Sequence, residues 1–282
     1  MSEAHPPNQE QAALCNDSSG RTWVEMQDVL DRLFAPFEGP LIEAAYPGEA
    51  GRVLDVGCGA GATTLAMARR LGPKGFCLGL DISGPLVAAA KVRAAAEGLS
   101  SVTYVHADAQ TYAFEPNGFD AVISRFGVMF FDDAEAAFAN IKRAARHRAK
   151  LAFLAWRSPA ENPFMTTALR AAAPLLPSLP TPNPDAPGQF AFADRDKVRR
   201  ILDASGWVDI DVTPIDVPSS VAEQDLRAYF TKLGPVGQAL RDMKDEETRA
   251  RIVEALHVAF EPYLEHGTAR FAAACWLVRA RG

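Results

Sequence analysis

Three closely spaced glycines are the part of this sequence best suited to bind a ligand through its backbone. Residues 53–56 form a short, mostly apolar run that is followed by Gly57, Gly59 and Gly61. Glycines at this density allow a tight turn, and a ligand can come close to the amides of that turn because no side chains intervene. The pattern becomes helical from Thr63 onward. A strand, a glycine turn and a helix form the opening unit of a nucleotide-binding α/β fold.

Acidic residues follow the next two apolar runs. Asp81 lies 24 residues after Gly57, close to the roughly 20 expected for a carboxylate that accepts both hydroxyls of a ribose. Asp108 ends the following run, where a carboxylate can accept a hydrogen bond from an adenine amino group. A single aspartate in such a place can equally cap a helix or face solvent. Two of them at successive strand ends after a glycine turn favour an adenosine site.

These side chains need a parallel sheet that brings the strand ends to one edge. Apolar runs and helical patterns alternate along the first half of the chain, and this predicts right-handed crossovers between parallel strands. We expect an α/β, Rossmann-like, seven-stranded and mostly parallel sheet with helices on both faces. The expected strands are residues 53–56, 76–80, 102–105, 119–126, 150–156, 208–217 and 271–279.

Composition sets the limits on the function. The chain has 282 residues, 48% of them hydrophobic, with a formal charge of −6, which argues against a general nucleic-acid surface. Its 4 cysteines show no C-x-x-C spacing and are typical of a reduced, cytoplasmic protein, and no metal-ligand pattern is present. No run is long enough for a membrane span, and the first 20 residues lack a signal-peptide core. The sequence carries no signal for an oligomeric state.

Segments outside the alternating pattern are expected to form a cap and lids. We predict an N-terminal helical cap over residues 1–48, with a helix from Trp23 to about Pro36. A second domain over residues 49–282 would carry lid insertions at about 158–193 and 219–267. The cap can simply pack on the core, or its residues Arg21, Thr22 and Trp23 can help to close a ligand site.

The glycine turn does not by itself identify the ligand, because residues 57–62 also satisfy the dinucleotide pattern G-x-G-x-x-G/A. Asp55, two residues before the first glycine, suits a cationic amino group and would repel a pyrophosphate.

Four motifs then resemble those of class I S-adenosylmethionine-dependent methyltransferases. They are V-L-D-V-G-C-G-A-G at 53–61, G-L-D-I-S at 79–83, H-A-D-A-Q at 106–110 and F-D-A-V-I-S at 119–124. A bacterial small-molecule subgroup is also similar at G-x-x-W (20–23) and at residues 124–131, 161–163 and 187–194. The family usually has a Pro-Gly-Gly turn before its fifth strand, where this chain has the basic residues 146–150.

The resemblance implies a role for each matching residue. Gly57, Cys58 and Gly59 would line the methionine part of the cofactor, with Asp55 orienting its amino group. The other residues would contact the ribose, the adenine and the methionine. The full set assigned to S-adenosyl-L-methionine, which becomes S-adenosyl-L-homocysteine, is Trp23, Asp55, Gly57, Cys58, Gly59, Asp81, Ile82, Asp108, Ala109, Gln110 and Ser124. The resemblance also implies an antiparallel C-terminal hairpin from the last two strands.

The methyl acceptor is expected beyond the fourth and fifth strands, where acceptors enter in this fold. The candidate pocket residues are Arg125, Phe126, Met129, Trp156 and Asn162. Arg125 would either tie down a lid or bind an anionic acceptor, because a charged side chain in an apolar loop needs a partner. No residue stands out as a general base, so the catalytic residue is unknown. The basic run 142–150 is interpreted as the last turn of a helix.

The leading hypothesis is therefore a methyltransferase acting on a small-molecule or peptide acceptor, most plausibly at oxygen. Two alternatives stay open: an NAD-dependent oxidoreductase, and a non-catalytic S-adenosylmethionine-binding protein on the same fold.

Overall fold

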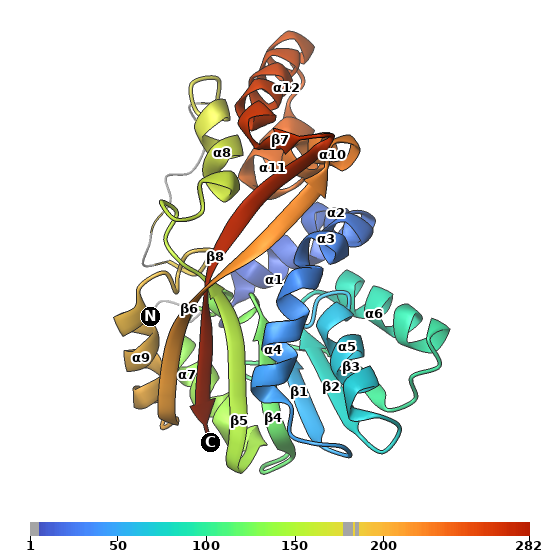
Figure 1. Ribbon diagram of the computed structural model, residues 1–282, viewed down its shortest axis with the longest axis vertical. Coiled ribbons are helices and arrows are strands. Elements are labelled where there is room, and N and C mark those ends of the chain that lie inside the picture. Colours follow the sequence, from blue (N-terminus) through green and yellow to red (C-terminus); the bar gives the residue numbers. More distant parts are fainter. Residues whose placement is uncertain (1–5, 177–182, 184–185) are drawn as a thin grey trace.

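The computed structural model describes residues 6–176, 183 and 186–282. A mixed sheet forms its lower half and a layer of helices its upper half (Figure 1). The sheet has 8 strands, seven of them in the order β3-β2-β1-β4-β5-β8-β6. These are β1 Arg52–Val56, β2 Phe76–Asp81, β3 Val102–His106, β4 Phe119–Arg125, β5 Ala145–Trp156, β6 Val208–Ala222 and β8 Thr268–Arg281.

Strands β1 to β5 are parallel, whereas β8 runs antiparallel to both β5 and β6. The short β7, Leu264–Glu265, pairs with β8. The predicted fold class is confirmed, including the C-terminal hairpin. Strand β1 has β2 on one side and β4 on the other, so the strand order reverses at β1 and ligands of open α/β sheets bind beyond its carboxyl end.

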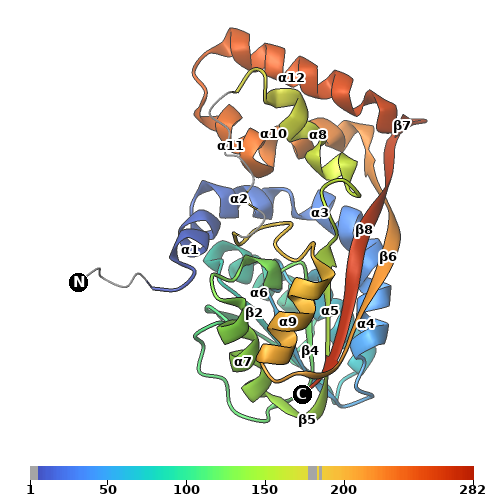
Figure 2. The same cartoon turned by 90° about the vertical axis from the view of Figure 1, so that its left-hand side faces the viewer.

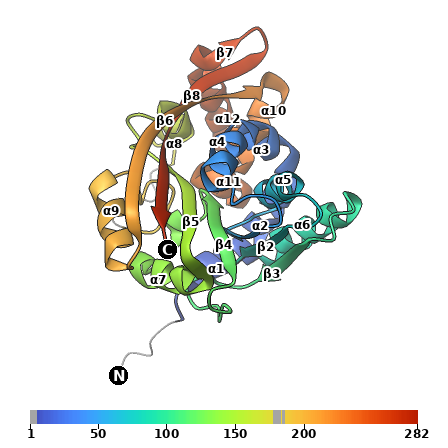
Figure 3. The same ribbon diagram turned by 60° about the horizontal axis from the view of Figure 1, so that its bottom comes forward.

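Helices cover both faces of this sheet (Figure 3). Helices α4 (Glu38–Ala45), α5 (Ala62–Leu71) and α6 (Gly84–Ala96) lie on one face. Helices α7 (Ala134–Ala144) and α9 (Arg195–Ala204) lie on the other. The central strands are therefore buried on both sides, which explains their almost continuous apolar sequence.

Four helices form the upper layer, which stands over the carboxyl end of the sheet (Figure 2). They are α8 Pro163–Ala172, α10 Glu223–Lys232, α11 Gly234–Asp242 and α12 Glu246–Phe260. Their apolar residues form a second buried cluster that includes Phe164, Phe230 and Phe260. The long β6–β8 hairpin runs from the sheet up into this layer. Helices α8 and α11 were not predicted from the sequence.

The N-terminal segment folds as three short helices between the two layers. They are α1 Gln9–Asn16, α2 Ser18–Glu25 and α3 Gln27–Phe34, and the short helix η1 Ala35–Phe37 follows them. The expectation of one helix from Trp23 to about Pro36 was wrong, because the chain changes direction at Met26. Residues 1–5, 177–182 and 184–185 lie outside the described residues, and the last two ranges belong to the lid insertion expected at about 158–193. The proposed domain boundaries stay a prediction.

Two further sequence predictions are corrected by the structure. Helix α7 ends at Ala144 and β5 begins at once, so most of the basic run 142–150 is strand and not the end of a helix. Arg148 has a φ of 59° there, which supplies the local irregularity that the usual Pro-Gly-Gly turn would provide. The sequence pattern also suggests a helix over residues 220–233, but residues 220–222 extend β6 and the helix begins at Glu223.

Candidate functional site

The glycine turn after β1 is held against the neighbouring strand by its own amides. The amides of Gly57 and Cys58 donate to the carbonyl oxygen of Leu80 in β2, at 2.8 and 3.1 Å. Gly57 and Gly59 have φ angles of 70° and 54°, which other residues adopt only with strain. A Cβ on Gly57 would lie 2.7 Å from the Cα of Gly127, so two backbones meet here without side chains between them.

Asp81 fixes the turn from the end of β2. Its Oδ2 accepts a hydrogen bond from the amide of Gly59 and its Oδ1 one from the amide of Ser83, both at 2.8 Å. Burial raises the pKa of this carboxyl, and the two amides oppose that shift by favouring the charged form. Each carboxylate oxygen can accept more than one hydrogen bond, so the two oxygens of Asp81 can also accept hydrogen bonds from two ribose hydroxyls.

Asp55 lies beneath the turn and leaves a polar atom without a partner. Its Oδ2 accepts a hydrogen bond from the Thr64 hydroxyl at 2.6 Å, whereas its Oδ1 is buried with no partner in the part of the chain that the structure describes. Burial raises the pKa of this carboxyl to about 6. A buried unpaired carboxylate oxygen is costly unless a cation meets it, so Asp55 fits the amino group of a methionine moiety, directly or through water.

Asp108 and Ala109 follow β3 at the same edge of the sheet. The carboxylate of Asp108 accepts a hydrogen bond from the amide of Gln110 at 2.8 Å and is also in contact with Asn8. Asp108 stays partly exposed, whereas Ala109 is buried. The arrangement leaves one carboxylate partly exposed at the cavity, beyond the end of β3.

A cavity of about 630 Å³ runs along these strand ends and up toward α10 and α11. Most of the residues predicted for the two ligands line it. They are Trp23, Gly57, Cys58, Gly59, Asp81, Ile82, Asp108, Ala109, Arg125, Phe126, Met129 and Trp156. Thr22 lines it as well, whereas Arg21 lies outside it and pairs with Asp17.

Four predicted site residues lie outside the cavity lining: Asp55, Gln110, Ser124 and Asn162. Ser124 is buried and its hydroxyl accepts from the amide of Gly127 at 3.2 Å, so it shapes the turn after β4. The Gln110 side chain accepts hydrogen bonds from Asn8 and from the amide of Asp133. For these two residues the structure indicates support of the walls and not direct contact.

Asn162, which was predicted for the acceptor pocket, is bonded to β8 in the structure. Its amide donates to the carbonyl of Ala274 and its Oδ1 accepts from the amide of the same residue, both at 2.9 Å. The side chain is 1% exposed. It therefore joins the segment after β5 to β8, and it has no free group to offer an acceptor.

The wall above the turn is aromatic. The rings of Phe126 and Trp156 stack with centroids 4.1 Å apart and an interplanar angle of 5°, and Phe34 packs on both. Phe126 has a φ of 63°, a conformation that costs a non-glycine residue free energy and recurs at functional sites. The strain is offset by the stacking, and together they hold the ring at the cavity wall.

Arg125 is engaged with the N-terminal segment. Its guanidinium lies 3.5 Å from a carboxylate oxygen of Glu38 and 3.4 Å from the carbonyl oxygen of Phe34. Burial lowers its pKa and Glu38 opposes that shift. These contacts join Arg125 to the N-terminal cap, which was neither of the two partners expected for it, a lid and an anionic acceptor.

Gln27 and the residues of the upper wall were not predicted from the sequence. The Oε1 of Gln27 is buried at the cavity with no partner among the described residues. Gln27, Leu30, Asp31 and Phe34 share one face of α3, and this spacing is a signal that could have been found. From the upper layer come Met165, Leu169, Tyr229, Phe230, Leu233 and Val236.

No histidine of the described segments lines this cavity, and His106 contacts the carbonyl oxygen of Ile82 at 3.0 Å. Within residues 6–176, 183 and 186–282, no three His, Cys, Asp or Glu side chains are grouped to hold a metal ion. The same residues include no helix that is both long and apolar enough to cross a membrane.

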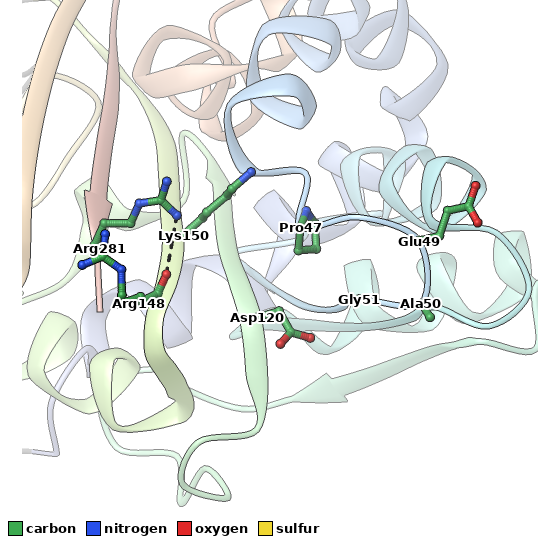
Figure 4. Close-up of a pocket in the computed structure, with 8 residues that line it drawn as sticks. All are labelled: Pro47, Glu49, Ala50, Gly51, Asp120, Arg148, Lys150 and Arg281. Carbon is green, nitrogen blue, oxygen red and sulfur yellow. Dashed lines mark hydrogen bonds between the residues drawn. The ribbon is translucent and has the colours of Figure 1, made fainter.

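A second hollow of about 380 Å³ lies at the opposite edge of the sheet (Figure 4). Three of its charged side chains form hydrogen bonds with the protein itself. Lys150 donates to the carbonyl of Tyr46, Asp120 accepts from the amide of Arg52, and Arg281 reaches the carbonyl of Arg148. These hydrogen bonds stabilise the turns below the sheet, and the hollow is separate from the candidate site.

The mostly parallel sheet with helices on both faces is the fold of methyltransferases of known structure. Residues 53–148 match a family model described as a methyltransferase domain. The resemblance to class I S-adenosylmethionine-dependent methyltransferases is thereby confirmed over the matched residues.

Individual relatives agree with that family. The chain is 32% identical over 120 residues to aklanonic acid methyltransferase of a Streptomyces species, covering 43% of this chain and 54% of that one. It is 35% identical over 113 residues to nocamycin O-methyltransferase of Saccharothrix syringae, covering 40% of each. The chain thus spans about half or less of these relatives. Its fold matches the crystal structure of a SAM-dependent methyltransferase from Aquifex aeolicus, with a TM-score of 0.52, 21% identity and coverage of 71% of this chain and 93% of the other.

Proposed function

We propose that this protein is an S-adenosylmethionine-dependent methyltransferase that transfers the methyl group to an oxygen atom of a small molecule. One observation carries the proposal. A single cavity joins a glycine turn, two strand-end carboxylates and an aromatic chamber, so a cofactor and an acceptor can meet inside it. The orphaned Oδ1 of Asp55 beneath the turn adds a place for the amino group of the cofactor.

The cavity residues are expected to bind the cofactor and to align the acceptor with it. The turn at 57–59 would bind the methionine part, Asp81 the ribose and Asp108 the adenine. When bound, S-adenosylmethionine supplies an activated methyl group on a sulfonium. The protein's main tasks are to align the acceptor behind that methyl group, to hold it close and to exclude water.

The chamber favours an acceptor with a large apolar surface. Phe34, Phe126 and Trp156 form one wall, and Tyr229 and Phe230 contribute to another. Two of the basic residues that line the cavity have acidic neighbours, Arg125 with Glu38 and Lys232 with Glu25. A cavity lined mostly by apolar and aromatic side chains fits a compact organic molecule better than a peptide.

Oxygen is proposed as the methylated atom for two reasons. A hydroxyl can pair with either end of the Gln27 amide, because it both donates and accepts. One relative is named as an O-methyltransferase. No general base lies among the residues proposed to contact the acceptor, so the acceptor hydroxyl is expected to be acidic enough to lose its proton to solvent.

The two alternatives make different demands on the same cavity. A dinucleotide would bring a pyrophosphate toward the turn above Asp55, where the ionised carboxylate opposes it. A non-catalytic binding protein would need the adenosyl site but not the aromatic chamber. The chamber and Asp55 therefore favour the methyltransferase.

Calorimetric titration tests the assignment. The wild-type protein should bind S-adenosylhomocysteine and not NADH. Asp81→Asn should bind S-adenosylhomocysteine at least tenfold more weakly, because hydrogen bonds to a charged group contribute about 1.5–3 kcal/mol each. Asp203→Asn, an exposed position on α9, serves as the matched control and should bind as the wild type does. Binding of NADH without S-adenosylhomocysteine would refute the proposal.

Activity is tested with radiolabelled S-adenosylmethionine and fractionated host extract. We expect label in an organic-extractable compound in a linkage that resists mild acid and base, as an ether does. Label in protein, or label lost in mild base, would exclude the small-molecule ether proposed here. Binding with no transfer to any fraction would favour the non-catalytic alternative.

A further inference from the structure

Helix α1 is fixed at one end to the loop after β2. The side-chain amide of Asn16 donates to the carbonyl of Ile82 at 2.9 Å, and its Oδ1 accepts from the amide of Gly84 at 2.8 Å. The carbonyl of Cys15 accepts from the Ser83 hydroxyl at 2.8 Å. This loop carries Asp81 and Ile82, which are proposed to contact the ribose and the adenine.

The other end of α1 is fixed to the loop after β3 through Asn8. The Nδ2 of Asn8 lies 3.0 and 2.9 Å from the two carboxylate oxygens of Asp108, and 3.1 Å from the Oε1 of Gln110. The backbone amide of Asn8 donates to the carboxylate of Asp132, and the amide of Asp132 donates back to the Oδ1 of Asn8 at 2.7 Å. Asn8 is 2% exposed.

This contact is built from a residue type suited to it. Asn8 has a φ of 55°, in the left-handed region that asparagine tolerates better than most residues. Its partners lie 100 to 124 positions away in the sequence. A buried polar side chain that bonds to three distant residues is a specific tertiary contact and not a local turn.

Helix α1 therefore bridges the two loops that form the adenosyl end of the cavity. Asn8, Gln11, Leu14 and Cys15 on its inner side line that cavity. Asp108 is not used up by these bonds, because two carboxylate oxygens offer about four acceptor positions. It also lines the cavity and is partly exposed. A ligand amino group can reach Asp108 while Asn8 stays bound to it.

We propose that residues 8–16 form a strap over the adenosyl end of the cofactor site, and that Asn8 is its latch and the positioning residue for Asp108. The latch orients the Asp108 carboxylate so that it can accept a hydrogen bond from the adenine amino group. It also closes the route by which the adenosyl group leaves. This inference rests on the proposed function.

Two measurable properties follow. Dissociation of S-adenosylhomocysteine should be slow, since the Asn8 contacts must open first. The site should also prefer an adenine over a hypoxanthine ring, because the latter has an oxygen in place of the amino group and would face the fixed carboxylate with an acceptor. Both properties should weaken together when the latch is removed.

The test compares Asn8→Asp with the wild type by stopped-flow dissociation and equilibrium binding. Aspartate keeps the size and the backbone preference of asparagine, but it cannot donate and it repels Asp108. We expect dissociation of S-adenosylhomocysteine to be at least about tenfold faster, and the preference over S-inosylhomocysteine to fall several-fold. Asn8→Gly, which suits the positive φ, should act in the same direction.

Gln9→Ala is the matched control, since Gln9 is exposed on the same helix, and it should behave as the wild type does. If Asn8→Asp and Asn8→Gly release the ligand at the wild-type rate and keep the wild-type preference, the latch does not exist. If they bind more tightly, Asn8 competes with the amino group, and the proposal is equally overturned. Failure of the wild type to bind S-adenosylhomocysteine would instead refute the proposed function.

Discussion

At the scale of single residues, the site is defined by polar atoms that the protein itself leaves incompletely paired. Asp55 Oδ1 and Gln27 Oε1 are the buried side-chain atoms without a partner among the described residues. Both lie at the cavity or directly beneath it. Since native proteins pair nearly all buried polar groups, such atoms indicate where a ligand is expected to supply the missing contact.

Asp55 predicts how cofactor binding depends on pH. Its pKa is raised to about 6, so below that pH the carboxyl is neutral and must lose a proton before it can pair with an ammonium group. Affinity for S-adenosylhomocysteine should rise with pH from 5 toward 6.5 and then level off. Titration calorimetry across this range measures the slope, and Asp55→Asn should flatten it. An equal slope in the variant would assign the titration to another group.

The same carboxyl affects the stability of the unliganded protein. The folded state holds the Asp55 proton up to about pH 6, whereas an unfolded chain releases it at the ordinary value of 3.8. Folding therefore takes up a proton between these values, and stability falls as pH rises through them, by roughly 3 kcal/mol in total from this group. The difference between denaturation curves of the wild type and Asp55→Asn, followed from pH 4 to 7, should show this decline and no further change above pH 6.5.

Substitution of Gln27 is expected to weaken the use of the acceptor without changing the binding of the cofactor. Gln27→Leu removes the free amide but keeps an apolar wall, so a hydroxyl-bearing acceptor would lose a hydrogen bond of about 0.5–1.5 kcal/mol. We expect kcat/KM for the acceptor to fall by about three- to tenfold, with unchanged binding of S-adenosylhomocysteine. Loss of cofactor binding in steady-state and titration experiments would show that Gln27 contacts the cofactor and not the acceptor.

At the scale of elements, the site depends on how closely two loops approach. The turn after β1 and the loop after β4 meet at Gly57 and Gly127. A Cβ on Gly127 would lie 2.8 Å from both the Cα of Gly57 and the carbonyl oxygen of Val56. Unlike Gly57, Gly127 has an ordinary φ of −83°, so a substitution there tests space alone.

Gly127→Ala should force the two loops apart. We expect a loss of about 1–3 kcal/mol in unfolding free energy from overpacking, together with weaker binding of S-adenosylhomocysteine. Gly39→Ala is the control, because a Cβ there meets nothing within 4 Å and the residue lies in α4. It should be neutral or slightly stabilising. Equal effects of the two substitutions in denaturation and binding experiments would contradict the close approach.

The sequence predicted most of this element-scale arrangement because its signals are local. Residue type and spacing at the end of a single strand were enough to predict each of three features: the turn at 57–61, Asp81 and Asp108. The upper wall could not be predicted in this way, since Phe230 and Val236 reach the cavity only through packing between α10, α11 and α3. The bond between Asn162 and Ala274 could not be predicted for a related reason: the two residues are 112 positions apart, so no local pattern reveals it.

At the scale of the whole molecule, two apolar cores are joined by a few long-range connections. One core surrounds the sheet and the other fills the upper helical layer. The β6–β8 hairpin runs through both, and Asn162 joins the start of the α8 segment to β8. The cavity lies where the layers meet, so its shape depends on how these connections hold them.

Asn162→Ala should destabilise the protein without a direct effect on ligand binding. The substitution removes the Asn162 Oδ1 from the buried amide of Ala274, a loss that costs about 1–3 kcal/mol, whereas the carbonyl of Ala274 keeps the amide of Arg157 at 3.0 Å. We expect a lower unfolding free energy in denaturant and near-normal affinity for S-adenosylhomocysteine in the fraction that stays folded. Normal stability with impaired turnover of the acceptor would instead restore a role for Asn162 in the pocket.

The distribution of the cavity walls between the two layers has an evolutionary consequence. Residues that would recognise the cofactor lie on the sheet and the N-terminal strap, whereas much of the acceptor chamber is supplied by α8, α10 and α11. Natural variation in those helices can retune which compound is methylated while the machinery for the methyl donor is inherited unchanged. Exchanging this helical layer between homologous enzymes is thus a rational route to altered selectivity.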